Sequence, residues 1–290
     1  MLAAIRMTLA LLKLRIGVAI AASALAGMVA TSGQPLSLAQ SAALLLAVLG
    51  ASGAAGAFNH YYERDSDRLM RRTQSRPFAS GAFRASAWWL AGFFALLAGS
   101  LALAAAAGGA ISALYVFLGA FTYGILYTVW LKSRSVWNIV VGGLAGSFAV
   151  LAGAAAIDPS PQAVPMLLAL VLFLWTPPHF WSLAAAKSAD YAQAGVPMLP
   201  VVAPERVWTL AILAHTVGVL VISLIPLAFG SGILYGLGAA TGGFVFLLKS
   251  WELYRRPSRQ AAIGNFLASL LQLLLLVAGV VLDRLFGPLL

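Results

Sequence analysis

The chain has 290 residues, of which 62% are hydrophobic and only 9% are charged, and its mean hydropathy is +0.94. This composition excludes an ordinary soluble globular protein and indicates a polytopic membrane protein. The absence of cysteine excludes a disulfide framework and a thiolate metal site. The net charge of +10 does not require a nucleic acid partner, because membrane proteins keep basic residues on one side of the bilayer.

Apolar runs of about 20 residues, the length that crosses a bilayer, recur nine times along the chain. The runs are rich in glycine and alanine, which let helices approach closely in lipid. The first run lacks a small-residue cleavage site, so we interpret it as a retained helix. We therefore predict an all-α membrane protein, a bundle of about nine transmembrane helices in a single domain over residues 1–290. The predicted spans are 15–33, 38–58, 86–106, 110–130, 137–157, 163–184, 207–229, 232–249 and 261–283.

The predicted spans place nearly all basic residues on one side of the membrane. Of the 18, 17 lie around the start of the first run or in alternate connections, and Arg284 is the exception. We interpret Arg6, Lys13 and Arg15 as charges that flank the first run. Because lysine and arginine collect in cytoplasmic connections, we predict a cytoplasmic N-terminus and an external C-terminus. No long transit segment rich in arginine and serine precedes the first run, which favours the inner membrane of a bacterium.

The connection at residues 59–81, NHYYERDSDRLMRRTQSRPFASG, carries an unusual set of charges. It holds three of the eight acidic residues and five of the 18 basic ones. Asn59, Glu63 and Asp67 recur every four residues and would therefore share one helix face. Three oxygen ligands at the cytoplasmic end of a membrane helix suit Mg²⁺, which also takes phosphate oxygens.

The same connection has a simpler interpretation as a solvated loop. Basic residues are expected here, so Arg72 and Arg76 alone do not establish a phosphate site, although arginine suits phosphate oxygens. The acids are not required by the orientation rule and favour a metal–diphosphate site. Asp65 lies off the shared face and would support the site or cap a turn. Pro77 predicts that the helical stretch ends at Arg76.

A second polar stretch, WTPPHFWSLAAAKSADYAQAGVPMLP, covers residues 175–200. Pro177 and Pro178 predict a break or kink in the helix, of the kind that lines a cavity at membrane depth. His179 follows in an aromatic setting that suits either simple packing or a functional role. Lys187 and Asp190, three residues apart, suit either a site or a surface ion pair.

A weaker group lies at the cytoplasmic junction of the spans 110–130 and 137–157. Tyr123, Tyr127 and Lys132 are residue types that are expected at a membrane interface. Asn138, at the start of the next apolar run, is placed as an N-cap would be. Neither feature indicates a site by itself.

The first motif resembles the signature of the intramembrane prenyltransferases of the UbiA type, and most of all the subgroup that farnesylates protohaem IX to make haem O. In that subgroup an asparagine precedes three alternating aspartates and then M-x-R-T-x-x-R-P-x-x-S-G. The matching residues here are Asn59, Glu63, Asp65, Asp67, Met70, Arg72, Thr73, Arg76, Pro77, Ser80 and Gly81. The stretches PPHFWSLAAAKSADYAQAGVPMLPVV and LKSRSVWNIVVGGLAGSF resemble further signatures, so the resemblance covers about residues 10–280.

Three departures from the subgroup pattern matter. Glu63 stands where aspartate is usual, which keeps the charge and lengthens its reach. Ala189 precedes Asp190 where the subgroup has a pair of acids, which puts the second metal-binding acid in doubt. The prolines usual after Gly146 are absent.

The resemblance implies transfer of the farnesyl group of farnesyl diphosphate to a vinyl group of protohaem IX (haem B), with addition of water and release of pyrophosphate. Haem B is then a substrate of haem O and haem A biosynthesis, Mg²⁺ is the cofactor, and haem A synthase or oxidase assembly factors act downstream. The implied metal ligands are Asn59, Glu63, Asp67 and Asp190, which with Lys187 make up the catalytic residues. The implied substrate-binding residues are Arg72, Arg76, Lys132, Tyr123, Tyr127, Asn138, His179 and Tyr191, with His179 facing the haem iron or a propionate.

Other functions fit part of the sequence. A prenyltransferase of the same type acting on a quinone precursor, a chlorophyllide or a phenolic acid would use the same site. A transporter would place polar groups near the membrane midplane, whereas the charges here are predicted at the cytoplasmic edge. A structural subunit of a respiratory complex would leave the register of the acids unexplained.

Overall fold

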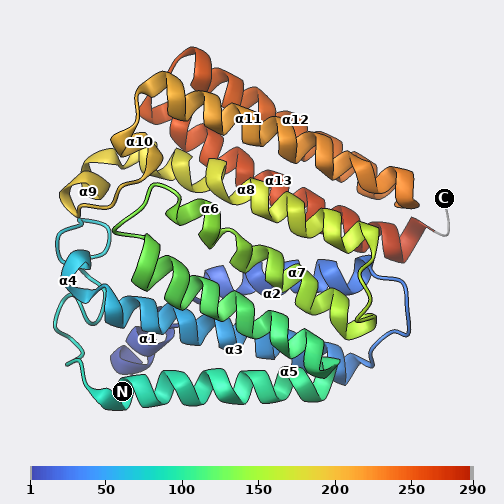
Figure 1. The fold of residues 1–290 in the computed structure, drawn as a ribbon, viewed down its shortest axis with the longest axis horizontal. Helices are drawn as coiled ribbons and strands as arrows, with labels where there is room; N and C mark the ends of the chain where they lie inside the picture. Colours follow the sequence, from blue (N-terminus) through green and yellow to red (C-terminus); the bar gives the residue numbers. More distant parts are fainter. Residues whose placement is uncertain (1, 288–290) are drawn as a thin grey trace.

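The computed structural model describes residues 2–287, except for the side chains of residues 2–6, so the predicted flanking charge Arg6 lies outside the described side chains. The described residues form helices and connections without a strand, arranged as a bundle (Figure 1). The elements are α1 (Leu2–Leu11), α2 (Leu14–Ala30), α3 (Leu38–Tyr62), α4 (Arg64–Asp67), α5 (Ala87–Phe121), the π-helix η1 (Thr122–Leu131), α6 (Asn138–Gly142), α7 (Leu144–Ile157), α8 (Ala163–Ala186), α9 (Ser188–Gln193), α10 (Leu199–Val202), α11 (Glu205–Leu224), the 3₁₀ helix η2 (Ile225–Phe229), α12 (Ile233–Arg255) and α13 (Arg259–Phe286).

Within the described residues, seven helical segments are long and apolar enough to cross a membrane, so the predicted class of an all-α membrane protein is confirmed. These segments are Leu38–Tyr62, Ala87–Leu131, Asn138–Ile157, Ala163–Ala186, Glu205–Phe229, Ile233–Arg255 and Arg259–Phe286. The predicted span 15–33 corresponds to α2, an apolar helix of 17 residues that is shorter than these. The predicted spans 86–106 and 110–130 fall together in the 45-residue segment formed by α5 and η1.

The chain reverses direction inside α5 at Gly109. This residue has φ 83° and ψ 172°, a conformation that glycine adopts readily and other residues avoid. The two arms of α5 run in opposite directions in Figure 1, and both line an apolar cavity together with α3. The Ser112 hydroxyl, just after the reversal, donates to the Ala152 carbonyl of α7 at 2.7 Å. The two predicted spans therefore form a hairpin.

Glycines set the distance between α2 and α7. A Cβ atom added at Gly27 would lie 2.0 Å from the Val150 carbonyl oxygen, and one added at Gly153 would lie 1.9 Å from the Ala24 carbonyl oxygen. Neither position can accept a side chain without separation of the helices, as expected where small residues hold membrane helices together. This contact fixes α2, and with it the end of the chain that leads into α2.

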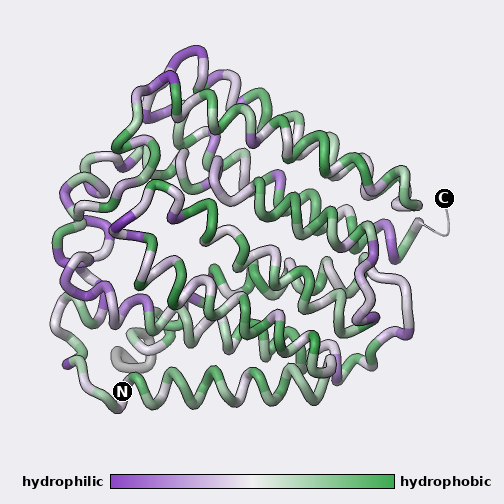
Figure 2. Tube along the Cα trace, in the orientation of Figure 1, coloured by the Kyte–Doolittle hydropathy of each residue, from purple (hydrophilic) through white to green (hydrophobic). Residues whose placement is uncertain are grey.

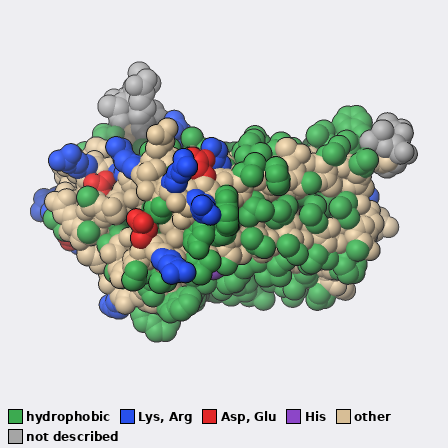
Figure 3. All heavy atoms as spheres, turned by 90° about the horizontal axis from the view of Figure 1, so that it is seen from above, with side chains coloured by type: hydrophobic (Ala, Val, Ile, Leu, Met, Phe, Trp, Pro, Cys, Tyr) green, Lys and Arg blue, Asp and Glu red, His purple; other side chains and the backbone are tan. Residues whose placement is uncertain are grey.

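Polar residues gather at one end of the bundle. Hydrophilic segments lie around α4, α9 and α10 (Figure 2), and lysine, arginine and acidic side chains cluster over the same end in the space-filling view (Figure 3). The α1 helix also lies at this end, whereas α13 finishes at the opposite one (Figure 1). The fold therefore brings the connections after α3 and after α8 together, although more than 100 residues separate them.

Of the predicted break or kink at Pro177 and Pro178, the break is wrong, because α8 continues through both prolines to Ala186. Proline removes two backbone donors from the helix, but its neighbours hold the segment in place. The Trp175 indole donates to the Ser269 carbonyl of α13 at 2.9 Å, and the Ser182 hydroxyl donates to the Pro178 carbonyl at 2.6 Å. Packing against α13 thus overrides the local signal.

We expect Gly153→Ala to lower the thermal unfolding midpoint of the detergent-purified protein, because overpacking against Ala24 costs about 1–3 kcal/mol. Gly99→Ala is the matched control, since a Cβ atom there meets nothing within 4 Å. Fluorescence-detected size exclusion after heating would measure both variants. An equal midpoint for the two would contradict the packing of α2 on α7.

Candidate functional site

The first motif places three polar side chains on one face of the chain. The Glu63 amide donates to the Asn59 carbonyl at 2.9 Å and the Asp67 amide to the Glu63 carbonyl at 2.8 Å, so the helical register continues across the break between α3 and α4. The three residues are only 2–5% exposed. Two carboxylates and an amide are thus buried side by side at the polar end of an apolar bundle.

The chain after Asp67 folds back on itself, so the prediction that the helical stretch runs to Arg76 is wrong. The structure has turns there instead, in which the Thr73 hydroxyl donates to the Asp67 carbonyl at 3.0 Å and Arg68 Nε donates to the Ala79 carbonyl at 3.0 Å. Asp65 points outward, 71% exposed, and lies 3.4 Å from Arg68 in a surface pair. This reversal brings Arg76 to Asp67, the last residue of α4.

Arg76 and Lys132 neutralise the buried acids. Arg76 Nη1 donates to both carboxylate oxygens of Asp67, at 3.0 and 2.7 Å, and lies 3.9 Å from Glu63 Oε2. Lys132 Nζ donates to Glu63 Oε2. Burial of an acidic side chain without such a partner is costly, and these contacts compensate that cost for both acids. Every member of the network comes from a different turn or helix.

The π-helix η1 aligns a column of side chains beside the acids. Tyr123 and Tyr127 stack with ring centroids 5.7 Å apart, and Lys132 Nζ lies 5.8 Å from the Tyr127 ring. In an α-helix Lys132 would be about two and a half turns from Tyr123, on the opposite face. The wider turn of η1 brings all three to one side, which agrees with the frequent occurrence of π-helical turns at functional sites.

Lys13 belongs to the same cluster, although the sequence indicated only a flanking charge. Its ammonium donates to Asn59 Oδ1 at 2.6 Å and to the Tyr123 hydroxyl at 2.9 Å. Asn59 Nδ2 in turn donates to Thr128 Oγ1 at 3.0 Å. Burial and the nearby Arg76 lower the pKa of Lys13 well below its usual value, while Glu63 opposes that shift. No sequence signal identified Thr128, an ordinary residue of an apolar run.

The second motif contributes unevenly to the site. Tyr191 of α9 is buried, which raises the pKa of its phenol, and the Arg72 side chain of the first motif lies beside it. Lys187 and Asp190 are half-buried, and no ion pair of the described residues joins them, contrary to the proposed surface pair. Asp190 also does not join Glu63 and Asp67: within residues 2–287 no three acidic or histidine side chains converge as metal ligands.

Asn138 and His179 occupy buried positions of different kinds. Asn138 is the first residue of α6 rather than its N-cap, because its side chain donates to the Lys132 carbonyl at 3.2 Å instead of capping the helix. His179 lies between the rings of Trp175 and Phe266, with centroids 4.3 and 4.6 Å away. Its Nδ1 is 2.7 Å from the Ser269 hydroxyl. Nε2 is therefore the ring nitrogen that makes no hydrogen bond to the described residues.

The acid cluster offers the ligands that a hard divalent cation takes. Asn59 Oδ1, Glu63 and Asp67 supply oxygen atoms only, the donor set that suits Mg²⁺. Glu63 Oε1 is buried without a hydrogen-bond partner, and buried polar atoms seldom remain so without a reason. The residues present therefore fit a magnesium ion, with Arg76 and Lys132 placed to neutralise an anion beside it.

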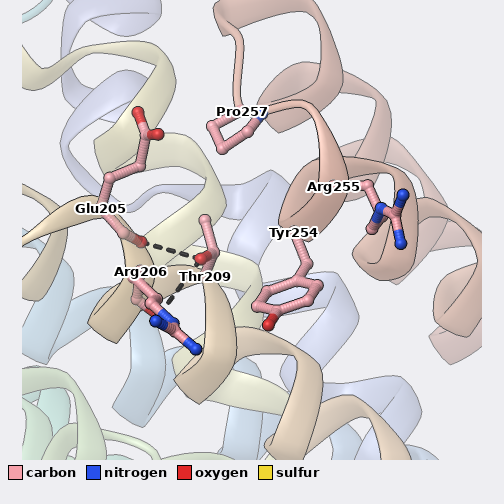
Figure 4. Close-up of a pocket in the computed structure, with 6 residues that line it drawn as sticks. All are labelled: Glu205, Arg206, Thr209, Tyr254, Arg255 and Pro257. Atoms are coloured by element: carbon pink, nitrogen blue, oxygen red, sulfur yellow. Dashed lines mark hydrogen bonds between the residues drawn. The ribbon is translucent and has the colours of Figure 1, made fainter.

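Two cavities lie near the polar end. An apolar cavity of about 130 Å³ runs between α3 and both arms of α5, and Ala55 and Gly124 on its wall are one turn from Asn59 and Thr128. A larger one, of about 430 Å³, lies between the polar ends of α11 and α12 (Figure 4). It is lined by Glu205, Arg206, Thr209, Tyr254, Arg255 and Pro257. None of the predicted site residues lines this second cavity.

A family model described as the UbiA prenyltransferase family matches residues 20–279 of the chain. The chain belongs to the UbiA prenyltransferase family. Among UbiA relatives it is 55% identical over 287 residues to "Protoheme IX farnesyltransferase 2" of Paramagnetospirillum magneticum, covering 99% of this chain and 100% of that one. It is 49% identical over 282 residues to "Protoheme IX farnesyltransferase 1" of the same organism, covering 96% and 98%. The family recognised from the sequence motifs is thus confirmed.

Solved structures of other proteins share the fold. A digeranylgeranylglyceryl phosphate synthase structure superposes with a TM-score of 0.75 at 16% identity, covering 97% of this chain and 98% of that one. A UbiA homolog from Archaeoglobus fulgidus, bound to DMAPP and Mg²⁺, superposes with a TM-score of 0.72 at 17% identity, covering 94% and 99%. These matches establish the arrangement of helices over almost the whole chain.

We expect Arg76→Ala to destabilise the protein, because it leaves the buried Asp67 carboxylate unpaired, and removal of one partner of a buried pair costs about 3–5 kcal/mol. Arg71→Ala, on the exposed surface of the same turn region, is the control and should leave the thermal midpoint unchanged. If both variants melted with the wild type, the ionic network would not contribute to folding.

Proposed function

We propose that this protein transfers the farnesyl group of farnesyl diphosphate to a vinyl group of protohaem IX, with addition of water, to give haem O and pyrophosphate. The observation that carries the proposal is the buried cluster of Asn59, Glu63 and Asp67, surrounded by cations, in a UbiA family chain that matches a protoheme IX farnesyltransferase at 55% identity over its full length. A bound metal ion would account for the acidic side chains, and an anionic substrate would account for the basic side chains around them.

The residues divide the work by their chemistry. Heterolysis of the allylic C–O bond leaves a carbocation and an anionic diphosphate, so the barrier falls when positive charge meets the leaving group. Arg76 and Lys132 are placed to donate to its oxygens, and Arg72 approaches from the rim beside Tyr191. The apolar cavity one turn from Asn59 offers the isoprenoid chain a wall of alanine, phenylalanine and leucine side chains that excludes water.

A magnesium ion fits this site. Asn59, Glu63 and Asp67 would hold it, and when bound it supplies further positive charge to the departing diphosphate. The relative bound to DMAPP and Mg²⁺ supports the same pairing here. Asp190 of α9 remains the proposed fourth ligand, although it does not converge with Glu63 and Asp67 in this structure.

The protohaem acceptor would approach from the second motif. His179 would reach the haem iron or a propionate through Nε2 alone, because its ring faces and Nδ1 are taken by Trp175, Phe266 and Ser269. Lys187 and Asn138 remain proposed site residues. His179→Ala with unchanged haem binding and activity would remove this role.

We also propose the membrane arrangement. The α2 helix, the two arms of α5 and the remaining six apolar segments give nine crossings in one domain, with the polar end in the cytoplasm of a bacterial inner membrane. The lysines and arginines gathered at that end support this orientation. The ends of α1 and α13 at opposite poles of the bundle fit an odd number of crossings.

The reaction is tested with purified protein, haem B, farnesyl diphosphate and Mg²⁺, with haem O measured by chromatography and mass spectrometry. We expect Asp67→Asn to lower the rate by about 100-fold or more, because a preorganised charge at the reacting centre is lost. Asp65→Asn is the control, since that carboxylate is 71% exposed and should leave the rate unchanged.

Other outcomes discriminate between functions. Prenylation of a quinone precursor in place of protohaem would keep the site and change the acceptor. Absence of any pyrophosphate release from the wild type would overturn the prenyltransferase assignment and favour a transporter.

Orientation can be tested because the chain has no cysteine. We expect Ser160→Cys, between α7 and α8, to react with an impermeant maleimide in intact spheroplasts, and Ser133→Cys, between η1 and α6, to react only after permeabilisation. Both serines are exposed. Labelling of both from the same side would contradict the proposed arrangement.

A further inference from the structure

Lys13 adopts an unusual backbone conformation. Among the described residues other than glycine it alone has a positive φ, 47° with ψ 44°, in the left-handed region. Side chains with a Cβ atom avoid this region, and lysine has no short polar group to offset the strain locally. Such strain persists where surrounding contacts over-determine it, often at functional sites. The contacts of the Lys13 side chain are therefore the place to look for its cause.

The strained turn delivers the lysine side chain across α3. Lys13 joins α1 to α2, and Leu11 before it is buried with 1% exposure. The stem of Lys13 runs over Gly56, where an added Cβ atom would lie 3.4 Å from Lys13 Cδ. Leu12 passes over Gly53 in the same way, at 3.3 Å. Two glycines one turn apart thus form a smooth surface on α3 that leads the stem towards the next turn, where the ammonium meets the site.

The ammonium then fixes a proposed metal ligand. It donates to Asn59 Oδ1 at 2.6 Å while Thr128 accepts from Asn59 Nδ2 at 3.0 Å, so the orientation of the amide is set from both ends. A second donor reaches the Tyr123 hydroxyl at 2.9 Å, and the third is left for another acceptor. A lysine that only set the orientation of the chain in the membrane would need none of these contacts, since any cation near the membrane surface serves that purpose.

We propose that Lys13 is a substrate-binding residue whose ammonium donates to the diphosphate of the isoprenoid substrate while keeping Asn59 Oδ1 turned into the site. This inference rests on the proposed function. Arg76 and Lys132 are paired with Asp67 and Glu63, whereas the amino group of Lys13 faces an amide and a hydroxyl and keeps one donor for a substrate oxygen.

The test is binding of inorganic pyrophosphate in the presence of Mg²⁺, measured by calorimetry on the purified wild type, Lys13→Met and Arg15→Met. Both variants remove one positive charge from the same segment, but Arg15 is exposed and has no place in the site. We expect Lys13→Met to raise the dissociation constant at least tenfold and Arg15→Met to leave it within twofold. Lys13→Arg, which keeps the charge in another shape, should recover part of the affinity.

Lys13→Gly separates binding from folding, because it relieves the strained φ while removing the same ammonium. We expect a higher thermal midpoint than for Lys13→Met together with equally weak binding. Unchanged pyrophosphate affinity in Lys13→Met, or an equal loss in Arg15→Met, would overturn the role of Lys13. Failure of the wild type to bind pyrophosphate would instead overturn the proposed function on which that role depends.

Discussion

Glu63 and Asp67 are two acidic side chains buried at the end of an apolar bundle, and the surrounding structure is arranged so that each meets a cation. Burial without such a partner is costly. The two cations come from separate segments, Arg76 from the turns after α4 and Lys132 from the end of η1. The backbone of each segment has to place its cation beside an acid, so the fold of the polar end is tied to the pairing of these charges.

The apolar part of the protein holds in place the helices that lead to the site. The glycine contacts hold α2 against α7, and the reversal at Gly109 returns the second arm of α5 to α3. Because lipid offers helices no hydrophobic reason to associate, close backbone contact has to supply the attraction. The site thus depends on small residues many turns away from it.

The sequence predicted those features that depend on local periodicity and missed those that depend on tertiary contact. The shared face of Asn59, Glu63 and Asp67 was predictable because four-residue spacing survives the break after α3. The return of Arg76 was not, since a proline rule describes where a helix stops and not where the chain goes next. Lys13 was taken for a flanking charge because its partner lies 46 residues away. The break predicted at the prolines of α8 does not occur, because packing on α13 outweighs the local effect of these residues.

The π-helical winding of η1 makes the site depend on the number of residues per helical turn as well as on residue identity. Lys132 lies nine residues after Tyr123, and in an α-helix this spacing would place the two side chains on opposite faces. The wider turns of η1 place them on the same side, where Lys132 meets Glu63 and the Tyr127 ring. An alignment that scored residue identity alone would pass a chain with a different winding as intact, so the spacing between the tyrosines and the lysine is itself part of the signature.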